Sequence, residues 1–278
     1  MNDIRMRFPG GLKKAFTMSY DDGVEQDVRL ISIMRKNGVK GTFNLNGGLF
    51  APEGTVYPKG QVHRRMTLSA CKKAYAGEDL EVAVHGYTHP FLETLPAGPL
   101  TAQILKDRES LEEAFGTLVR GSAYPYGTYN DRVAAALDLC GIVYCRTVAS
   151  THDFRLPQNW LTLHPTCHHA DPALTELCEK FLASPADREP LMFYLWGHAY
   201  EFEGADNWEV IESFLSRIGG HDDIWYATNL QIHDYVKAFE ALIYSCDGRR
   251  VYNPTAADLW LETERKTVKI PAGAEIRL

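Results

Sequence analysis

Three short segments of the sequence carry side chains that can bind a metal ion or move a proton. Asp21 and Asp22 are adjacent, His85 and His89 are four residues apart, and His198 lies far along the chain. One carboxylate and two imidazoles can hold a divalent cation and leave positions open for water and substrate. A second carboxylate can then accept a proton and a distant histidine can donate one. Together these residue types suit the hydrolysis of an amide.

Each segment also has a purely structural explanation when it is taken alone. An Asp-Asp-Gly sequence is a common way to begin a helix, because aspartate accepts hydrogen bonds from the first backbone N–H groups. Two histidines four residues apart are a weak metal signal, and a single histidine after a strand is often a hydrogen-bonded core residue. The hypothesis of one shared site therefore depends on whether the fold brings the segments together.

The elements that would position these residues alternate between β-type and amphipathic segments. We expect strands at 14–20, 39–45, 80–85, 118–124, 142–148, 191–196 and 224–228, and helices at 24–37, 67–76, 100–115, 131–140, 172–182, 208–218 and 231–244. Strands separated by helices predict parallel βαβ units, and about seven of them favour an α/β barrel. The carboxyl ends of parallel strands meet at one edge, where Asp21, His85 and His198 are expected.

The last thirty residues follow a different pattern. Short segments at 251–252, 259–263 and 267–270 are predicted as antiparallel strands without helices between them. We therefore divide the chain into a catalytic (β/α) barrel at 1–245 and a short C-terminal β extension at 246–278.

Composition narrows the classes of function. The 278 residues include 45% hydrophobic and 23% charged side chains, which is typical of a globular protein with a large core. The formal charge of -7 argues against a protein that binds the nucleic-acid backbone. No apolar run reaches about 18 residues and the first residues lack an apolar signal segment, so we expect no membrane span and a cytoplasmic protein. The six scattered cysteines are expected to be reduced and buried.

Four motifs, in order along the chain, resemble those of the polysaccharide deacetylases, the NodB-homology group of carbohydrate esterase family four. They are 19–23 (SYDDG), 85–90 (HGYTHP), 124–127 (YPYG) and 195–198 (LWGH). The resemblance covers most of the predicted barrel. It implies a deformed (β/α) barrel with about seven parallel strands.

The resemblance also implies roles for individual residues. Asp21 would be the catalytic base and His198 the general acid. Asp22, His85 and His89 would hold the metal. Zinc is expected, although cobalt, nickel, iron or manganese also suit such a ligand set. The backbone N–H of Tyr126, which follows Pro125, would help to stabilise the oxyanion.

The sequence departs from the family pattern in two places, which indicates a divergent subfamily. The third motif normally begins with an arginine that anchors the base, and here Ala123 takes its place. Arg146, on the next predicted strand, is a candidate replacement. The fourth motif normally has two aspartates and a tryptophan, and its nearest match here, 150–154 (STHDF), keeps only Asp153.

Several polar and aromatic residues near the motifs are candidates for substrate contacts. The segment 164–169 (HPTCHH) is interpreted mainly as a substrate loop in which His168 or His169 donates hydrogen bonds to a sugar, and a second metal site is the alternative. Trp196 and Trp160 could stack on a sugar ring or belong to the core. Glu201 could hold sugar hydroxyls or orient His198.

These observations predict a metal-dependent enzyme that removes an acetyl group from an N-acetylated sugar. The alternatives are hydrolysis of a small non-sugar amide or of an O-acetyl ester at the same site, or a non-catalytic carbohydrate-binding barrel. The expected partner is a carbohydrate or a small amide, with neither nucleic acid nor membrane, and the sequence leaves the oligomeric state open.

Overall fold

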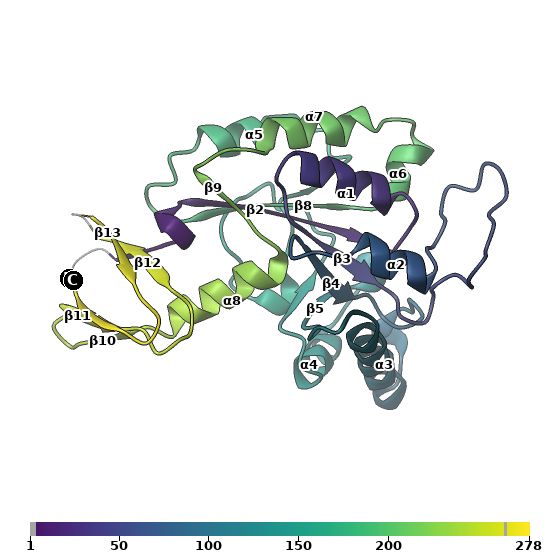
Figure 1. The fold of residues 1–278 in the computed structure, drawn as a ribbon. Coiled ribbons are helices and arrows are strands. Elements are labelled where there is room, and N and C mark those ends of the chain that lie inside the picture. Colours follow the sequence, from purple (N-terminus) through teal and green to yellow (C-terminus); the bar gives the residue numbers. More distant parts are fainter. Residues whose placement is uncertain (1–3, 264–265) are drawn as a thin grey trace.

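The core of the protein is one curved sheet of parallel strands. The computed structural model describes residues 4–263 and 266–278. Its main sheet has the order β6-β5-β4-β3-β2-β8-β7, with β9 paired to β2 (Figure 1). The strands are β2 (Lys14–Asp21), β3 (Gly41–Leu45), β4 (Leu80–Val84), β5 (Gly121–Ala123), β6 (Tyr144–Arg146), β7 (Cys167–His168), β8 (Leu191–Gly197) and β9 (Ile224–Tyr226). This arrangement confirms the predicted deformed barrel.

Strand β2 lies at the centre of the sheet and is buried on both faces. All eight of its residues are buried, and it pairs in parallel with β3, β8 and β9. Phe16, Met18 and Tyr20 belong to the main apolar cluster. Thr17, Ser19 and Asp21 alternate with them and are buried polar residues, and Thr17 donates a hydrogen bond of 2.8 Å to Asn229. The carboxyl end of β2 therefore delivers Asp21 into the interior of the barrel.

Helices surround the curled sheet and lie above and below it in the view of Figure 1. One group consists of α1 (Asp27–Lys36), α5 (Leu174–Ala183) and α7 (Glu209–Ile218). The other consists of α2 (Leu68–Ala74), α3 (Ala97–Phe115) and α4 (Asp131–Leu139), while α6 (Ala199–Gly204) follows β8 directly. Each long helix buries an apolar stripe at helical spacing, as α7 does with Ile211, Phe214, Leu215 and Ile218.

The tail forms two small antiparallel sheets, one of which also includes a strand from near the start of the chain. One has the order β1 (Arg5–Arg7), β12 (Leu259–Glu262), β13 (Thr267–Ile270); the other is β10 (Ile243–Tyr244), β11 (Arg250–Tyr252), β14 (Glu275–Arg277). They pack on α8 (Asn229–Glu240) through a second apolar cluster that includes Phe8, Tyr235 and Leu259. The C-terminal β extension is thus present. The proposed boundary at residue 245 stays a prediction.

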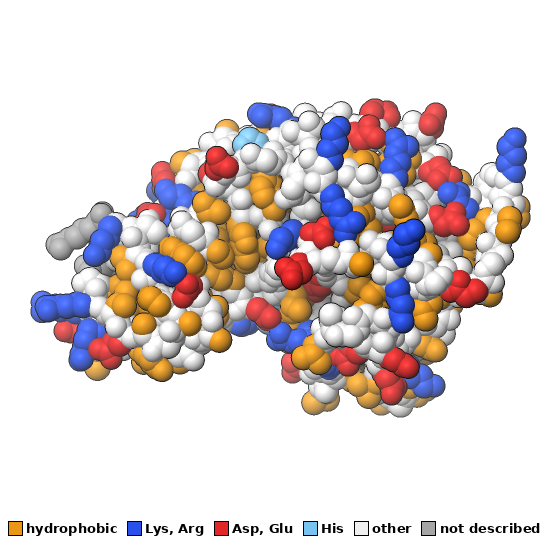
Figure 2. Space-filling model, viewed as in Figure 1, with side chains coloured by type: hydrophobic (Ala, Val, Ile, Leu, Met, Phe, Trp, Pro, Cys, Tyr) orange, Lys and Arg blue, Asp and Glu red, His pale blue; other side chains and the backbone are white. Residues whose placement is uncertain are grey.

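A few sequence-based assignments need correction. The helix expected at 231–244 is wrong at its end: α8 stops at Glu240, and Ile243 and Tyr244 form β10. The six cysteines are free as expected, but Cys246 is exposed rather than buried. Among the described residues, no helix is long and apolar enough to cross a membrane. On the face seen in Figure 2, acidic and basic side chains are interspersed rather than gathered by sign.

Candidate active site

The carboxyl ends of the strands bring the predicted residues to one cavity. Asp21 ends β2, His85 follows β4 and His198 follows β8. Because these strands are parallel, their ends lie at the same edge of the sheet. The cavity has a volume of about 410 Å³ and is lined by Asp21, Asp22, His63, Arg65, His85, His89, Tyr124, Tyr126, Gly127, Val148, Trp196, His198 and Tyr200.

Three residues of this cavity hold a backbone conformation that side chains normally avoid. Asp22, His89 and Tyr126 have φ angles of 81°, 53° and 60°. A left-handed conformation at a residue other than glycine costs free energy, about 1–3 kcal/mol, and such residues cluster at functional sites. Their presence around one cavity indicates that the fold maintains this geometry at a cost.

Asp22, His85 and His89 form a set that suits a divalent cation. One ligand atom from each lies within 4.8 Å of the others, and the two Nε2 atoms are 3.2 Å apart. His85 Nδ1 is 2.8 Å from the carbonyl oxygen of Ala123, so Nδ1 donates and Nε2 carries the free lone pair. Burial lowers the pKa of His85, and that of His89 to about 4, which keeps both imidazoles neutral. The donor set therefore fits a bound metal.

Asp107, on α3, hydrogen-bonds the backbone of the candidate ligand His85 and of Gly47. Its Oδ2 accepts the N–H of His85 at 2.9 Å and its Oδ1 accepts the N–H of Gly47 at 2.6 Å. Asn46 adds bonds of 2.6 Å to the carbonyl oxygens of His85 and Gly86. A carboxylate that bonds the backbone of a ligand fixes the position of that ligand. Burial raises the pKa of Asp107 to about 7.

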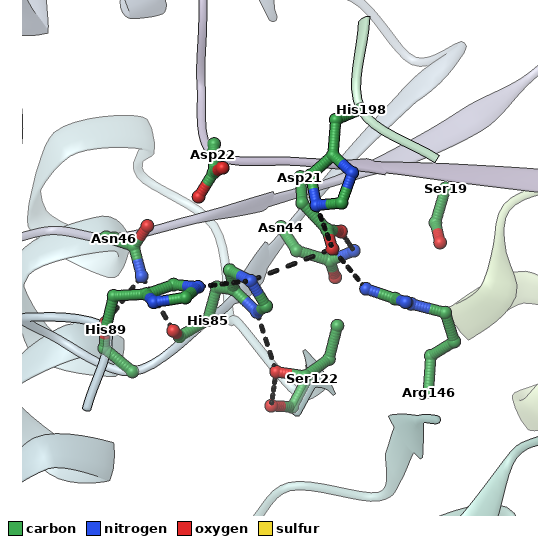
Figure 3. A network of polar contacts seen from close by, with 12 residues as sticks. Ser19, Asp21, Asp22, Asn44, Asn46, His85, His89, Ser122, Arg146 and His198 are labelled. Atoms are coloured by element: carbon green, nitrogen blue, oxygen red, sulfur yellow. Dashed lines mark hydrogen bonds and ion pairs between the residues drawn. The ribbon is translucent and has the colours of Figure 1, made fainter. Parts of the chain in front are cut away.

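Asp21 lies at the centre of the polar network in Figure 3. It is 2% exposed, and its Oδ1 accepts a hydrogen bond of 2.8 Å from Asn44. Its Oδ2 is 3.7 Å from Nε2 of His85 and 3.7 Å from Nε2 of His198, and it forms an ion pair with Arg146. Burial alone would raise the pKa of Asp21, but Arg146 and the imidazoles lower it overall. The carboxylate of Asp21 is therefore ionised.

Arg146 reaches Asp21 from the strand beside the one that carries the third motif. Residues Ala123 on β5 and Arg146 on β6 are direct register partners. The buried guanidinium also lies over the ring of Trp196, 4.2 Å from its centroid. The cation that the resemblance places at Ala123 is thus supplied by its neighbour across one pair of strands.

His198 is held by Glu201 rather than by Asp153. His198 Nδ1 is 3.2 Å from Glu201 Oε1, one helical turn along the chain. Asp153 instead pairs with Arg155 and lines a separate cavity of about 640 Å³. The Asp153 side chain accepts hydrogen bonds from the backbone N–H groups of Phe154 and Arg155, and these contacts do not reach His198. Among the described residues, Glu201 is the carboxylate that hydrogen-bonds His198.

Of the other residues predicted to contact the substrate, some line the cavity and others lie in the core. Trp196 and Tyr126 line the cavity, and the ring of Tyr126 lies 4.4 Å from that of His89. Pro125 is buried beside it. Trp160 is 5% exposed and packs edge-on against His233 in the second apolar cluster, away from the cavity lining.

Two residues of the cavity were missed by sequence reasoning. His63 Nε2 lies 3.2 Å from Asp22 Oδ2, and Arg65 pairs with Asp22 Oδ1 at 3.0 Å. Both belong to the segment 46–66, which projects from the body in Figure 1. The rule that functional residues follow strand ends passes over such a segment. Only its histidine and arginine content hinted at a role.

Comparison with known proteins agrees with this geometry. Residues 10–145 match the sequence model of the polysaccharide deacetylases. An uncharacterized protein of Bacillus subtilis (strain 168), YlxY, is 27% identical over 139 residues, which is 50% of this chain and 38% of that protein. The chain thus matches well under half of that relative's length.

Two solved structures share the fold. A Mycobacterium smegmatis protein assigned to the polysaccharide deacetylases aligns with a TM-score of 0.60 and 18% identity, over 85% of this chain and 94% of that one. The chitin deacetylase of Colletotrichum lindemuthianum aligns with a TM-score of 0.50 and 20% identity, over 78% of this chain and 85% of that one. These structures show that the fold is shared, and the match over residues 10–145 places that part of the chain in the polysaccharide deacetylase family.

Proposed function

We propose that the protein is a metal-dependent hydrolase that removes the acetyl group from an N-acetylated sugar. The observation that carries this proposal is the central place of Asp21. Its Oδ2 has Nε2 of His85, a candidate metal ligand, at 3.7 Å and Nε2 of His198, a candidate proton donor, also at 3.7 Å. A base between a metal site and an acid is the arrangement that amide hydrolysis needs.

Asp22, His85 and His89 would hold the cation, with zinc expected and cobalt, nickel, iron or manganese also compatible with the donors. When bound, such a cation supplies polarisation of the scissile carbonyl and lowers the pKa of water. Asn46 and Asp107 keep the ligand-bearing backbone in place. The proton transfers and the stabilisation of the oxyanion are carried out by side chains and backbone groups of the protein.

Asp21 accepts the proton of the attacking water, and the ion pair with Arg146 keeps it ionised until then. His198 Nε2 donates a proton to the departing nitrogen, so that acetate and a free amine leave. The N–H of Tyr126, presented by its left-handed backbone, stabilises the oxyanion, an interaction that can lower the barrier by about 3 kcal/mol.

The cavity walls suit a sugar ring. Trp196, Tyr126 and Tyr200 contribute aromatic faces, and aromatic rings combine a large apolar surface with polar edges. His63 and Arg65 also line the cavity and offer polar nitrogen atoms to hydroxyl groups. An N-acetylated carbohydrate presents both kinds of surface.

The test is acetate release by the purified chain after chelation and reloading with each of the five metals. N-acetylglucosamine oligomers, small non-sugar amides and O-acetyl esters are compared as substrates. Asp21→Asn and His198→Ala should each lower kcat by about 10²–10⁴-fold, because each removes a proton-transfer group. His152→Ala is the matched control, since His152 is an exposed histidine bonded to Asp171.

Each possible result decides between the alternatives. Turnover that needs no metal, or that persists in His198→Ala, contradicts the proposed mechanism. Turnover restricted to small amides or to esters transfers the mechanism to another substrate. Sugar binding without turnover in any metal identifies a non-catalytic barrel.

A further inference from the structure

The carboxylate of Glu201 contacts the imidazole rings of three histidines. Its Oε2 lies 3.1 Å from Nε2 of His168 and 3.1 Å from Nε2 of His169, while its Oε1 lies 3.2 Å from Nδ1 of His198. These histidines come from β7, from the residue after it, and from the end of β8. A single hydrogen bond would be enough to orient His198, so the two further imidazoles call for an explanation.

The proton positions follow from the atoms on the far side of each ring. The backbone N–H of Ala170, which can only donate, lies 3.1 Å from His168 Nδ1. The hydroxyl of Tyr20 lies 3.2 Å from His169 Nδ1. A neutral imidazole whose Nδ1 accepts a hydrogen bond carries its hydrogen on Nε2. Both Nε2 atoms therefore donate to Glu201, which as a carboxylate can only accept.

The same atoms could be taken for a second metal site, because ligand atoms of His168, His198 and Glu201 lie within 4.8 Å of one another. The bond from Ala170 argues against that interpretation. It occupies the Nδ1 lone pair of His168 and leaves an N–H rather than a lone pair facing Glu201. A hydrogen-bonded network fits these donors better than a cation does.

We propose that Tyr20, His168 and His169 are positioning residues for His198 that act through Glu201. The proposal rests on the proposed function of His198 as proton donor. The two imidazoles fix the Glu201 carboxylate so that Oε1 accepts the Nδ1–H of His198. Nε2 of His198, which faces Asp21, is then the nitrogen that exchanges its proton with the substrate.

Burial makes this chain of contacts rigid. Tyr20 is 1% and His169 is 3% exposed, and their rings stack with planes 8° apart. Buried hydrogen bonds of this kind do not compete with water. At its other end the ring of His168 packs edge-on against Trp196, 4.6 Å between centroids. The carboxylate of Glu201 is thus held from two sides.

The charged groups around His198 set the direction of its titration. Burial alone would lower the pKa of His198, but the hydrogen bond that it donates to Glu201 and the charges of Asp21 and Asp22 raise the pKa overall. His168, His169 and Tyr200 are further titratable groups that lie beside it. A general acid works while protonated, so the rate should fall as pH rises through this raised pKa. Weakening the Glu201 contact should move that fall to lower pH.

The sharpest test is Tyr20→Phe, which removes one hydroxyl and keeps the stacked ring. Nδ1 of His169 then loses its buried hydrogen-bond partner, so the ring is held less firmly against Glu201. We expect kcat to fall about 10-fold with KM unchanged, as a fraction of the 10²–10⁴-fold that a general acid contributes. Tyr75→Phe is the matched control, because it removes another buried hydroxyl, bonded to Asp27, outside this network.

A spectrum separates this proposal from the proposed function. In the full chain as purified, ¹⁵N spectra of the histidine rings should show His198 protonated at Nδ1 and altered by Tyr20→Phe but not by Tyr75→Phe. These signals do not depend on turnover, so an inactive protein would contradict the proposed function while the positioning network is still tested. A His198 signal indifferent to Tyr20→Phe overturns the network.

Substitutions at His169 supply the second measurement. His169→Gln keeps an N–H that can donate to Glu201, whereas His169→Leu removes it. We expect the pH profile of His169→Gln to stay close to that of the unsubstituted protein, and the alkaline fall of His169→Leu to move to lower pH. Equal profiles, or a second equivalent of zinc that is lost in His168→Gln, would overturn the proposal in favour of a structural role or a second metal site.

Discussion

At the scale of single residues, the position of the buried cation beside Asp21 makes a specific prediction. Arg146→Ala should destabilise the fold by about 3–5 kcal/mol, because it leaves a buried carboxylate without its partner. The guanidinium lowers the pKa of Asp21, so its loss should raise that pKa and move the acidic limb of the pH–rate profile to higher pH. Urea unfolding and a pH series of kcat/KM measure the two effects.

The control for this variant uses the register of the sheet. Ala123 lies opposite Arg146, so the double variant Ala123→Arg/Arg146→Ala moves the cation across the strand pair into the space that Arg146 vacates. We expect the double variant to recover part of the activity and to move the acidic limb of the pH–rate profile back toward lower pH. A double variant no better than Arg146→Ala would show that the position of the guanidinium matters as much as its charge.

The metal ligands predict a second measurable effect at the same scale. A cation that binds only the folded protein should stabilise it by about 2.7 kcal/mol at a concentration 100 times its Kd. Zinc added to the chelated protein should therefore raise the Tm, and Asp22→Asn should reduce that rise. The exposed pair of Lys13 and Asp187 offers a control, since Asp187→Asn should leave the zinc effect intact.

At the scale of elements, helix α3 should influence the metal site without touching the metal. Asp107→Asn keeps one acceptor oxygen and replaces the other with an amide, so one of the two backbone N–H groups loses its partner. We expect zinc affinity to fall about 10–100-fold, the usual range for groups that orient a ligand. Isothermal titration measures this change. An unchanged Kd would show that β4 alone fixes His85.

The alternation of strand and helix in the sequence predicted the barrel because burial on both faces and amphipathic spacing are local properties. Asp21, His85 and His198 could be placed at one edge for the same reason. Short elements such as β7 and α6 were not predicted, since two to six residues carry too little pattern. The contacts of His63 and Arg65 with Asp22 depend on the path of a long segment, which no periodicity reveals.

At the scale of the whole molecule, the tail lies at the opposite end from the carboxyl ends of the main strands (Figure 1). In one of its sheets, the fully buried Arg7 on β1 pairs with Glu262 on β12 at 2.9 Å, and Arg7 also donates a hydrogen bond to the carbonyl oxygen of Asp187, just before β8. Glu262→Gln weakens this pair and should lower the free energy of unfolding by about 1–3 kcal/mol. Because the site is remote, kcat should be unchanged. Calorimetry and an activity assay check the two statements, and a loss of kcat would reveal a connection between the tail and the site.

The pairing of Ala123 with Arg146 has a consequence for how relatives of this chain are found. A sequence pattern that demands arginine at the third motif would reject this chain, although Arg146 on the neighbouring strand forms an ion pair with Asp21. In a parallel sheet, a cationic side chain can come from either of two paired positions on neighbouring strands, and in both cases it can neutralise the same carboxylate. Ancestry searches in this family should therefore score the pair of positions jointly, so that either strand can contribute the cation.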